Sequence, residues 1–305
     1  MESVSSLLLG TIVLRPYVFA FLLLYLFAAI TDMGWRRTLL FTLVGWSVAF
    51  TAESLSIRVG IPFGLYHYLP TTADQELWIA GVPFMDSLSF VFLAYASWAL
   101  ASLAVLPVIK EGKGRWTFSL PPRGRFRFPV LLLTVVFMVL IDVVVDPLAV
   151  RGDQWFLGQI FYYPEPGAYF GVPVSNFVGW GVVGCTIMAL FALLEPSITD
   201  ETPRWAARLP LRPMYGAMLY YVVLGFTLTV TWIIQEKALF LAGLFIYTPL
   251  TTLLAITTFM RWREGQGVSP RNLQSWRGAM RDRGVHSNGT GSFPVEVIWK
   301  EHSPE

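Results

Sequence analysis

The sequence has few charged residues, one cysteine and three histidines. Only 14% of its 305 residues are charged and 55% are apolar or aromatic, so a water-soluble fold would leave too much apolar surface uncovered. The single cysteine, Cys185, excludes an internal disulfide and a cysteine-based metal cluster. His286 and His302 lie in the polar C-terminal segment, far from His67, so the sequence offers no histidine cluster for zinc or iron.

Motifs that would hold a nucleotide or activate a nucleophile are also missing. The sequence has no glycine-rich phosphate loop, no dinucleotide fingerprint and no nucleophile elbow. We therefore expect no cofactor and no bound metal. The net charge of +2 gives no reason to expect nucleic acid as a partner.

Long hydrophobic runs dominate the chain. Backbone groups in lipid must be hydrogen-bonded internally, so these runs predict an all-α, polytopic membrane helical bundle of about seven transmembrane helices, surrounded by membrane lipid. We expect residues 1–264 to form this domain and residues 265–305 to be a polar, disordered cytosolic tail. The first run contains Arg15-Pro16, so its helix can begin as late as Tyr17. The runs are 12–31, 38–54, 79–108, 128–146, 173–194, 213–234 and 238–260.

Lysine and arginine are unevenly distributed between the connections. Basic residues concentrate in cytosolic connections, so the more basic set predicts the inner side, with the N-terminus outside and the C-terminus inside a cell membrane. The predicted outer loops carry Arg58, Arg151 and Lys237. The predicted inner connections carry Arg36, Arg37, Lys110, Lys113, Arg115, Arg123, Arg125, Arg127, Arg204, Arg208, Arg212, Arg261 and Arg263.

Two stretches of the chain resemble each other. FGLYHYLP (63–70) precedes GVPFMD (81–86), and LGQIFYYP (157–164) precedes GVPVSN (171–176). We interpret them as parts of two candidate repeat units, 38–108 and 128–194. Both units cross the membrane in the same order of directions, so the repeat would be parallel. Parallel repeats of this kind tend to place a site between them. Pro83 and Pro173 suit the first turns of the helices that follow.

Carboxyl groups gather at the predicted outer ends of these helices. Asp142 and Asp146 are four residues apart and therefore share a helix face, about 6 Å apart along the axis. In an apolar setting each disfavours ionisation of the other, so one can stay protonated near neutral pH and act as a general acid. Glu53, Asp86 and Asn176 lie on the same predicted side of the membrane and complete the set of candidate catalytic residues. A purely structural polar contact is the alternative interpretation.

Aromatic residues are frequent near the same side. The predicted outer loops, about 55–78 and 147–172, are apolar enough to be partly re-entrant rather than freely solvated. Most aromatic residues in such positions pack or anchor the chain at the interface, and a minority line a pocket. The candidates for substrate binding are Tyr66, Trp78, Trp155, Tyr162 and Trp180.

The segments AES (52–54), GVPFMDS (81–87), DVVVDPLA (142–149) and YFGVPVSNFVGW (169–180) resemble the carotenoid biosynthesis membrane proteins that include the CruF-type hydratases. The resemblance covers roughly residues 40–195. It implies addition of water across the 1,2 double bond of an acyclic carotenoid end, without a redox cofactor. It implies substrates such as γ-carotene, lycopene or bisanhydrobacterioruberin, and other enzymes of the carotenoid pathway as partners.

Two other functions remain open at this point. A membrane prenyl transferase would use Asp142 and Asp146 to hold Mg²⁺ against a diphosphate, although the sequence lacks a second Asp-rich motif. A transporter or lipid-binding protein would also use carboxylates between parallel repeats. Sensitivity to EDTA distinguishes the first function, and incubation of pure protein with an acyclic carotene distinguishes the second.

The charge distribution makes a direct prediction about topology. A reporter fused after Arg263 is expected to be cytosolic, and one inserted near Asp153 is expected to be external. Protease protection and reporter activity in intact cells check both positions. The opposite pattern would contradict the predicted outer placement of the acidic residues.

Overall fold

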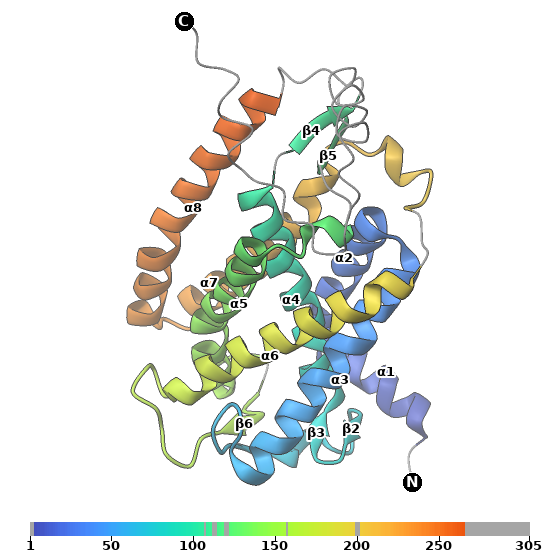
Figure 1. Cartoon of the computed structure of the whole chain (residues 1–305). Coiled ribbons are helices and arrows are strands. Elements are labelled where there is room, and N and C mark those ends of the chain that lie inside the picture. Colours follow the sequence, from blue (N-terminus) through green and yellow to red (C-terminus); the bar gives the residue numbers. More distant parts are fainter. Residues whose placement is uncertain are drawn as a thin grey trace, which may run out of the picture. The chain divides into compact units, whose positions relative to one another are not determined.

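The computed structural model describes residues 3–106, 108–111, 115–118, 122–156, 158–198 and 202–265. The predicted tail lies outside these ranges, apart from Gly265. Figure 1 shows the order of the elements along the chain. The helices are α1 (Val4–Leu14), α2 (Pro16–Met33), α3 (Trp35–Val59), α4 (Phe84–Val105), α5 (Phe128–Ala149), α6 (Val174–Leu194), α7 (Arg212–Ile233) and α8 (Lys237–Gly265). The short strands are β1 (His67–Tyr68), β2 (Trp78–Ile79), β3 (Val82–Pro83), β4 (Val108–Glu111), β5 (Arg115–Phe118) and β6 (Phe161–Tyr162).

Seven helices, α2 to α8, are long and apolar enough to cross a membrane within the described ranges. This confirms the predicted class, an all-α multi-pass membrane bundle. Large apolar side chains cover much of its outside, including Val178, Leu193 and Phe245. Such an apolar exterior is expected where lipid, and not water, surrounds the helices.

The ends of two helices differ from the prediction. The run expected over 12–31 is divided, because α1 ends at Leu14 and α2 begins at Pro16. Proline lacks an N–H group and has a fixed φ, so it starts a new helix more readily than it continues one. The run expected over 79–108 becomes helical only at Phe84, because β2 and β3 pair as a hairpin just before it.

Helix α4 lies at the centre of the bundle. In its most hydropathic 18-residue window 83% of the residues are buried, against 17–50% in the other six spans. Its sequence is apolar on every side and contains many alanines and serines, which allow neighbouring helices to approach closely. It packs against α2, α3, α5, α7 and α8.

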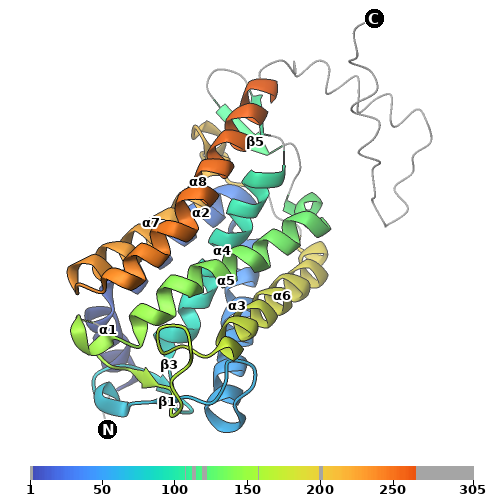
Figure 2. The same cartoon turned by 90° about the vertical axis from the view of Figure 1, so that its left-hand side faces the viewer.

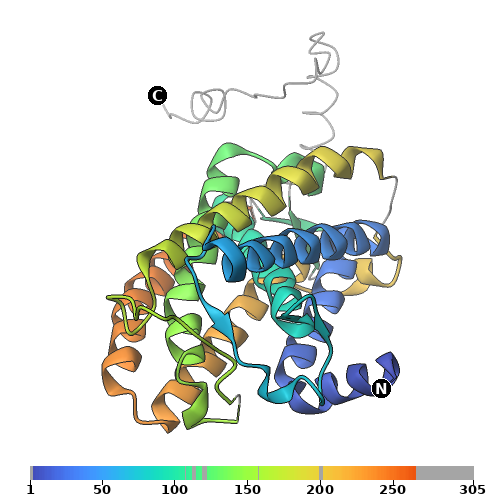
Figure 3. The same ribbon diagram turned by 90° about the horizontal axis from the view of Figure 1, so that it is seen from below.

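Four helices form a ring in which each packs against two others. Helix α3 contacts α4, α4 contacts α5, α5 contacts α6, and α6 contacts α3. Figure 3 shows α3 and α6 side by side. Helices α2 and α7 cover the side of α4 that faces away from this ring, and α8 packs along α7, as seen in Figure 2.

Two loops that are distant in sequence pair at one end of the ring. Strand β1, between α3 and α4, pairs antiparallel with β6, between α5 and α6. His67 lies opposite Tyr162, and Tyr68 lies opposite Phe161. We call this the β1/β6 end. The β4–β5 hairpin lies between α4 and α5, at the opposite end of these helices (Figure 1).

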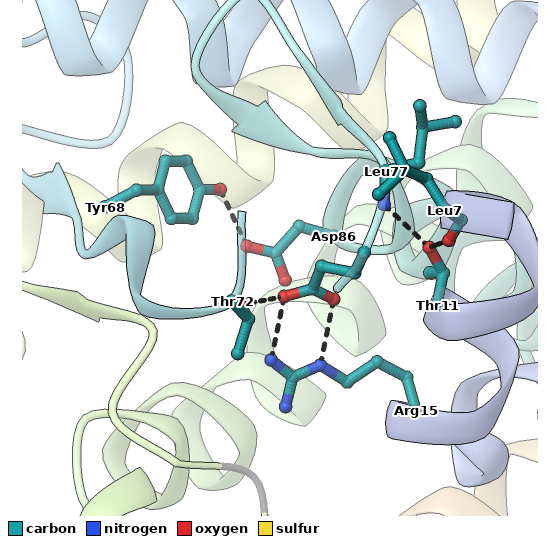
Figure 4. Close-up of polar contacts among 8 residues, drawn as sticks. Leu7, Thr11, Arg15, Tyr68, Thr72, Leu77 and Asp86 are labelled. Atoms are coloured by element: carbon teal, nitrogen blue, oxygen red, sulfur yellow. Dashed lines mark hydrogen bonds and ion pairs between the residues drawn. The ribbon is translucent and has the colours of Figure 1, made fainter. Parts of the chain in front are cut away.

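A buried ion pair fixes the loop that follows β1. Arg15, at the break between α1 and α2, donates from Nε and Nη2 to the carboxylate of Glu76 at 3.2 and 3.0 Å. Both side chains are almost completely buried. Thr72 donates to the same carboxylate, and the Leu77 amide donates to the Thr11 hydroxyl, as Figure 4 shows. The loop is thereby held against the N-terminal helices.

Removing one partner of this ion pair is expected to destabilise the protein strongly. Glu76→Gln leaves Arg15 buried without its counter-charge, which typically costs about 3–5 kcal/mol. The thermal unfolding midpoint in detergent is therefore expected to fall by several degrees. Asp74→Asn changes an exposed carboxylate of the same loop and is the matched control. Equal midpoints for the two variants would show that the ion pair contributes little.

Candidate active site

A cavity of about 140 Å³ lies among α2 to α7 at the β1/β6 end. Its walls are mostly apolar and aromatic, and Tyr66, Tyr163 and Trp180 are among the lining residues. Three carboxyl groups and one amide also reach it, those of Glu53, Asp86, Asp146 and Asn176. The cavity therefore combines a surface suited to hydrocarbon with a small number of hydrogen-bonding groups.

The first group of polar residues surrounds Asn176, in the first turn of α6. Its amide nitrogen donates to Asp142 Oδ2 at 2.9 Å and to Asp146 Oδ2 at 2.6 Å. The two carboxyl groups are therefore bridged by one amide nitrogen. We call Asp142, Asp146 and Asn176 the Asn176 cluster.

The second group surrounds Tyr68 of β1. Its hydroxyl lies 2.7 Å from Asp86 Oδ2 and 3.2 Å from Glu53 Oε1, and Figure 4 shows the contact with Asp86. Ser87 donates to the other oxygen of Glu53. The single proton of the Tyr68 hydroxyl can serve only one carboxyl group at a time. We call Glu53, Tyr68 and Asp86 the Tyr68 cluster.

Tyr68 remains a neutral hydrogen-bond donor over the whole physiological pH range. Burial raises the pKa of its hydroxyl well above the usual value, and the neighbouring carboxyl groups of Asp86 and Glu53 raise it further. The neutral phenol can therefore stabilise an ionised carboxylate beside it.

The structure brings together the polar residues expected from the sequence. Glu53, Asp86, Asp146 and Asn176 line the cavity, whereas Asp142 is fully buried, is hydrogen-bonded to Asn176 and does not line it. Oδ1 of Asp142 has no hydrogen-bond partner among the described residues. Asp86 and Asn176 lie in the first turns of α4 and α6, as predicted.

The two prolines that precede these helices lie one position earlier than predicted. Pro83 and Pro173 have extended backbone and occupy the N-cap positions. The first helical residues are therefore Phe84 and Val174.

The predicted aromatic residues divide into two groups. Tyr66, Trp155 and Trp180 line the cavity. Trp78 is not among the lining residues and packs against the ring of Tyr68 at 5.8 Å. Tyr162 is also outside the lining, and its side chain is 40% exposed. Successive residues of a strand point to opposite sides, so Phe161 faces the cavity and Tyr162 faces away.

Other lining residues were not among the candidates. Tyr68 lies in a two-residue strand, where no periodic pattern distinguishes it from the neighbouring aromatic residues. Tyr17 of α2 stacks on Phe226 of α7, Phe21 of α2 packs edge to face against the same ring, and all three line the cavity. Tyr17 and Phe21 are four residues apart, which places them on one helix face, and this spacing is the one signal visible in the sequence.

These features define a polytopic membrane protein with a buried, acid-lined, largely apolar pocket. The chain matches the family model described as carotenoid biosynthesis protein over residues 3–249 and therefore belongs to that family. Its role is accordingly in carotenoid biosynthesis, with a carotenoid-type substrate. The match extends beyond residues 40–195 and includes α2 and α7, which complete the cavity wall. No curated protein and no solved structure matches the chain significantly.

Proposed function

We propose that the protein is a carotenoid hydratase that adds water across the 1,2 double bond of an acyclic carotenoid end and forms a tertiary alcohol. The observation that best supports this function is the pair of carboxyl groups, Asp142 and Asp146, that Asn176 bridges beside an apolar cavity. An acyclic carotenoid end is a branched hydrocarbon without a polar group. Its binding site must therefore be apolar, and the only chemistry that it offers is that of its double bond.

Hydration of this double bond begins with transfer of a proton to the less substituted carbon. The π electrons form the new C–H bond and leave a tertiary cation at the other carbon. Water then forms the C–O bond and loses a proton to a base. The protein must supply a protonated acid, an environment that tolerates a cation, and a positioned water molecule.

The Asn176 cluster supplies the acid in this proposal. Two neighbouring carboxyl groups in an apolar setting retain one proton between them more readily than a single exposed carboxyl group does. Asp146 lines the cavity and can reach the substrate, whereas Asp142 acts through Asp146. Asn176 holds both carboxyl groups in place from one amide nitrogen.

Aromatic walls suit the cationic intermediate. Tyr66, Tyr163 and Trp180 line the cavity, and Trp180 is fixed by stacking on Phe90 at a ring distance of 4.2 Å. Each aromatic face stabilises a nearby cation by about 0.5–2 kcal/mol when water is excluded. These side chains can therefore lower the barrier without forming any bond to the substrate.

The source of the oxygen atom tests the reaction class. Purified protein incubated anaerobically with lycopene or γ-carotene in H₂¹⁸O, with and without EDTA, is expected to give the alcohol with one labelled oxygen for each hydrated end, detected by mass spectrometry. Oxygen taken from O₂ would identify an oxygenase instead. Binding of the carotene without chemical change would favour a transporter or lipid-binding protein, and loss of product with EDTA would indicate a metal-dependent reaction.

Isosteric substitutions test the acid. Asp146→Asn keeps the size and most hydrogen bonds of the side chain but removes its acidic proton, so the hydration rate is expected to fall about 100-fold or more. Asp142→Asn is expected to reduce the rate as well, because the pair can no longer share a proton. Asp153→Asn, exposed in the loop after α5, is the control and should match the wild type. Full activity of both variants would leave the pair with a structural role only.

A further inference from the structure

Two segments 90 residues apart share an unusual backbone geometry. Ala80 and Gly81 have φ values of 49° and 86°, and Phe170 and Gly171 have φ values of 50° and 90°. Positive φ is uncommon for a residue other than glycine. Each segment continues with Val-Pro and then a helix, and in each the valine bridges back to the residue three positions earlier.

Two arginines anchor these segments in the same way. Arg58, in the last turn of α3, donates to the carbonyl four residues before it at 2.6 Å and to the carbonyl of Ala80 at 2.9 Å. Arg151, just after α5, donates to the carbonyl four residues before it at 2.8 Å and to the carbonyl of Phe170 at 2.9 Å. Each arginine therefore ties the end of one helix to the turn before the next.

The strand pair has the register that a two-fold relation requires. When FGLYHYLP and LGQIFYYP are aligned by their glycines and prolines, His67 corresponds to Phe161 and Tyr68 to Tyr162. The pair His67–Tyr162 then becomes the pair Tyr68–Phe161 when the two segments are exchanged. Together with the matching turns and arginine contacts, this register indicates that α3–α4 and α5–α6 derive from one repeated unit.

The same alignment relates the polar residues of the cavity. Glu53 lies five residues before Arg58, and Asp146 lies five residues before Arg151, so they correspond. Asp86 and Asn176 each lie three residues after the proline of the turn, so they also correspond. The two halves differ at this last position, where one has a carboxyl group and the other has an amide.

This difference gives the two clusters opposite hydrogen-bond roles. The amide of Asn176 donates to two carboxyl groups, and two carboxyl groups this close in an apolar setting favour keeping a proton on one of them. Asp86 instead accepts from Tyr68, whose phenol is neutral and lies closest to that carboxyl group. Its position in the first turn of α4 also favours negative charge there.

We propose that the repeated unit has diverged into an acid half and a base half, in which Asp146 of the Asn176 cluster protonates the double bond and Asp86 of the Tyr68 cluster accepts the proton of the attacking water. This assignment rests on the proposed hydration. Tyr68 and Glu53 are positioning residues that orient Asp86 and the water molecule. In one turnover Asp146 loses one proton and Asp86 gains one. Transfer of a proton from Asp86 back to Asp146 restores the starting state.

Isotope exchange separates the two halves. Protonation of the alkene followed by loss of a proton from the same carbon places deuterium from D₂O in unreacted carotene, and this exchange needs only the acid half. Cleavage and re-formation of the C–O bond places ¹⁸O from water in the product alcohol, and this exchange needs only the base half. Both are read by mass spectrometry on purified protein in detergent.

Two substitutions are expected to give opposite results. Asp86→Asn should reduce hydration about 100-fold or more and keep deuterium exchange in the carotene. Asp146→Asn should abolish deuterium exchange and keep ¹⁸O exchange in the alcohol. Asp153→Asn is the control for both exchanges. Asp86→Asn introduces the residue that the other half has at the corresponding position. Tyr68→Phe keeps the carboxyl group of Asp86 and should give the same pattern with a smaller loss of hydration rate.

The outcomes distinguish the two levels of the proposal. Loss of both exchanges in either Asp86→Asn or Asp146→Asn, or normal hydration by Asp86→Asn, would overturn the division into halves while leaving a wild-type hydratase. A wild-type protein that neither hydrates the carotene nor exchanges isotope would reject hydration itself, and the division with it.

Discussion

Carboxyl groups inside an apolar bundle determine how the rest of this structure is arranged. A buried carboxyl group is costly unless it is protonated or hydrogen-bonded, and most of the buried ones here have such partners. Asp32 pairs with Arg125 near the β4–β5 hairpin, and Glu76 pairs with Arg15 near the β1/β6 end. The carboxyl groups at the cavity instead accept hydrogen bonds from the neutral side chains of Asn176, Tyr68 and Ser87, which suits the proton exchange that we propose for them.

The central helix and the paired loops position different parts of the site. Helix α4 gives the bundle a core to which five other helices attach, so the positions of the helix ends are well defined. Strands β1 and β6 then bridge the gap between the two helix pairs and bring Tyr68 over Asp86. The polar groups thus come from rigid elements, and their mutual distances depend little on the outer surface that contacts lipid.

Much of the fold could be predicted because lipid allows few alternatives. Apolar runs long enough to span a membrane must be helical, and seven were identified, although Pro16 and the β2–β3 hairpin shifted two helix starts. The acidic residues could be found because charge within such runs is rare. Tyr68, Phe226 and the distinction between Phe161 and Tyr162 could not be found, because they depend on how loops pair and how distant helices pack.

The pairing of β1 with β6 has a consequence for a protein that contains only one of the two repeated units. Each strand forms its ladder hydrogen bonds only with the other unit, so a protein containing one unit would expose an unpaired strand edge beside its helix ends. A second copy could satisfy that edge in the same antiparallel register, since this register is compatible with a two-fold axis. Fusion of two such copies would free each half to change independently, which a symmetric dimer of identical chains cannot do.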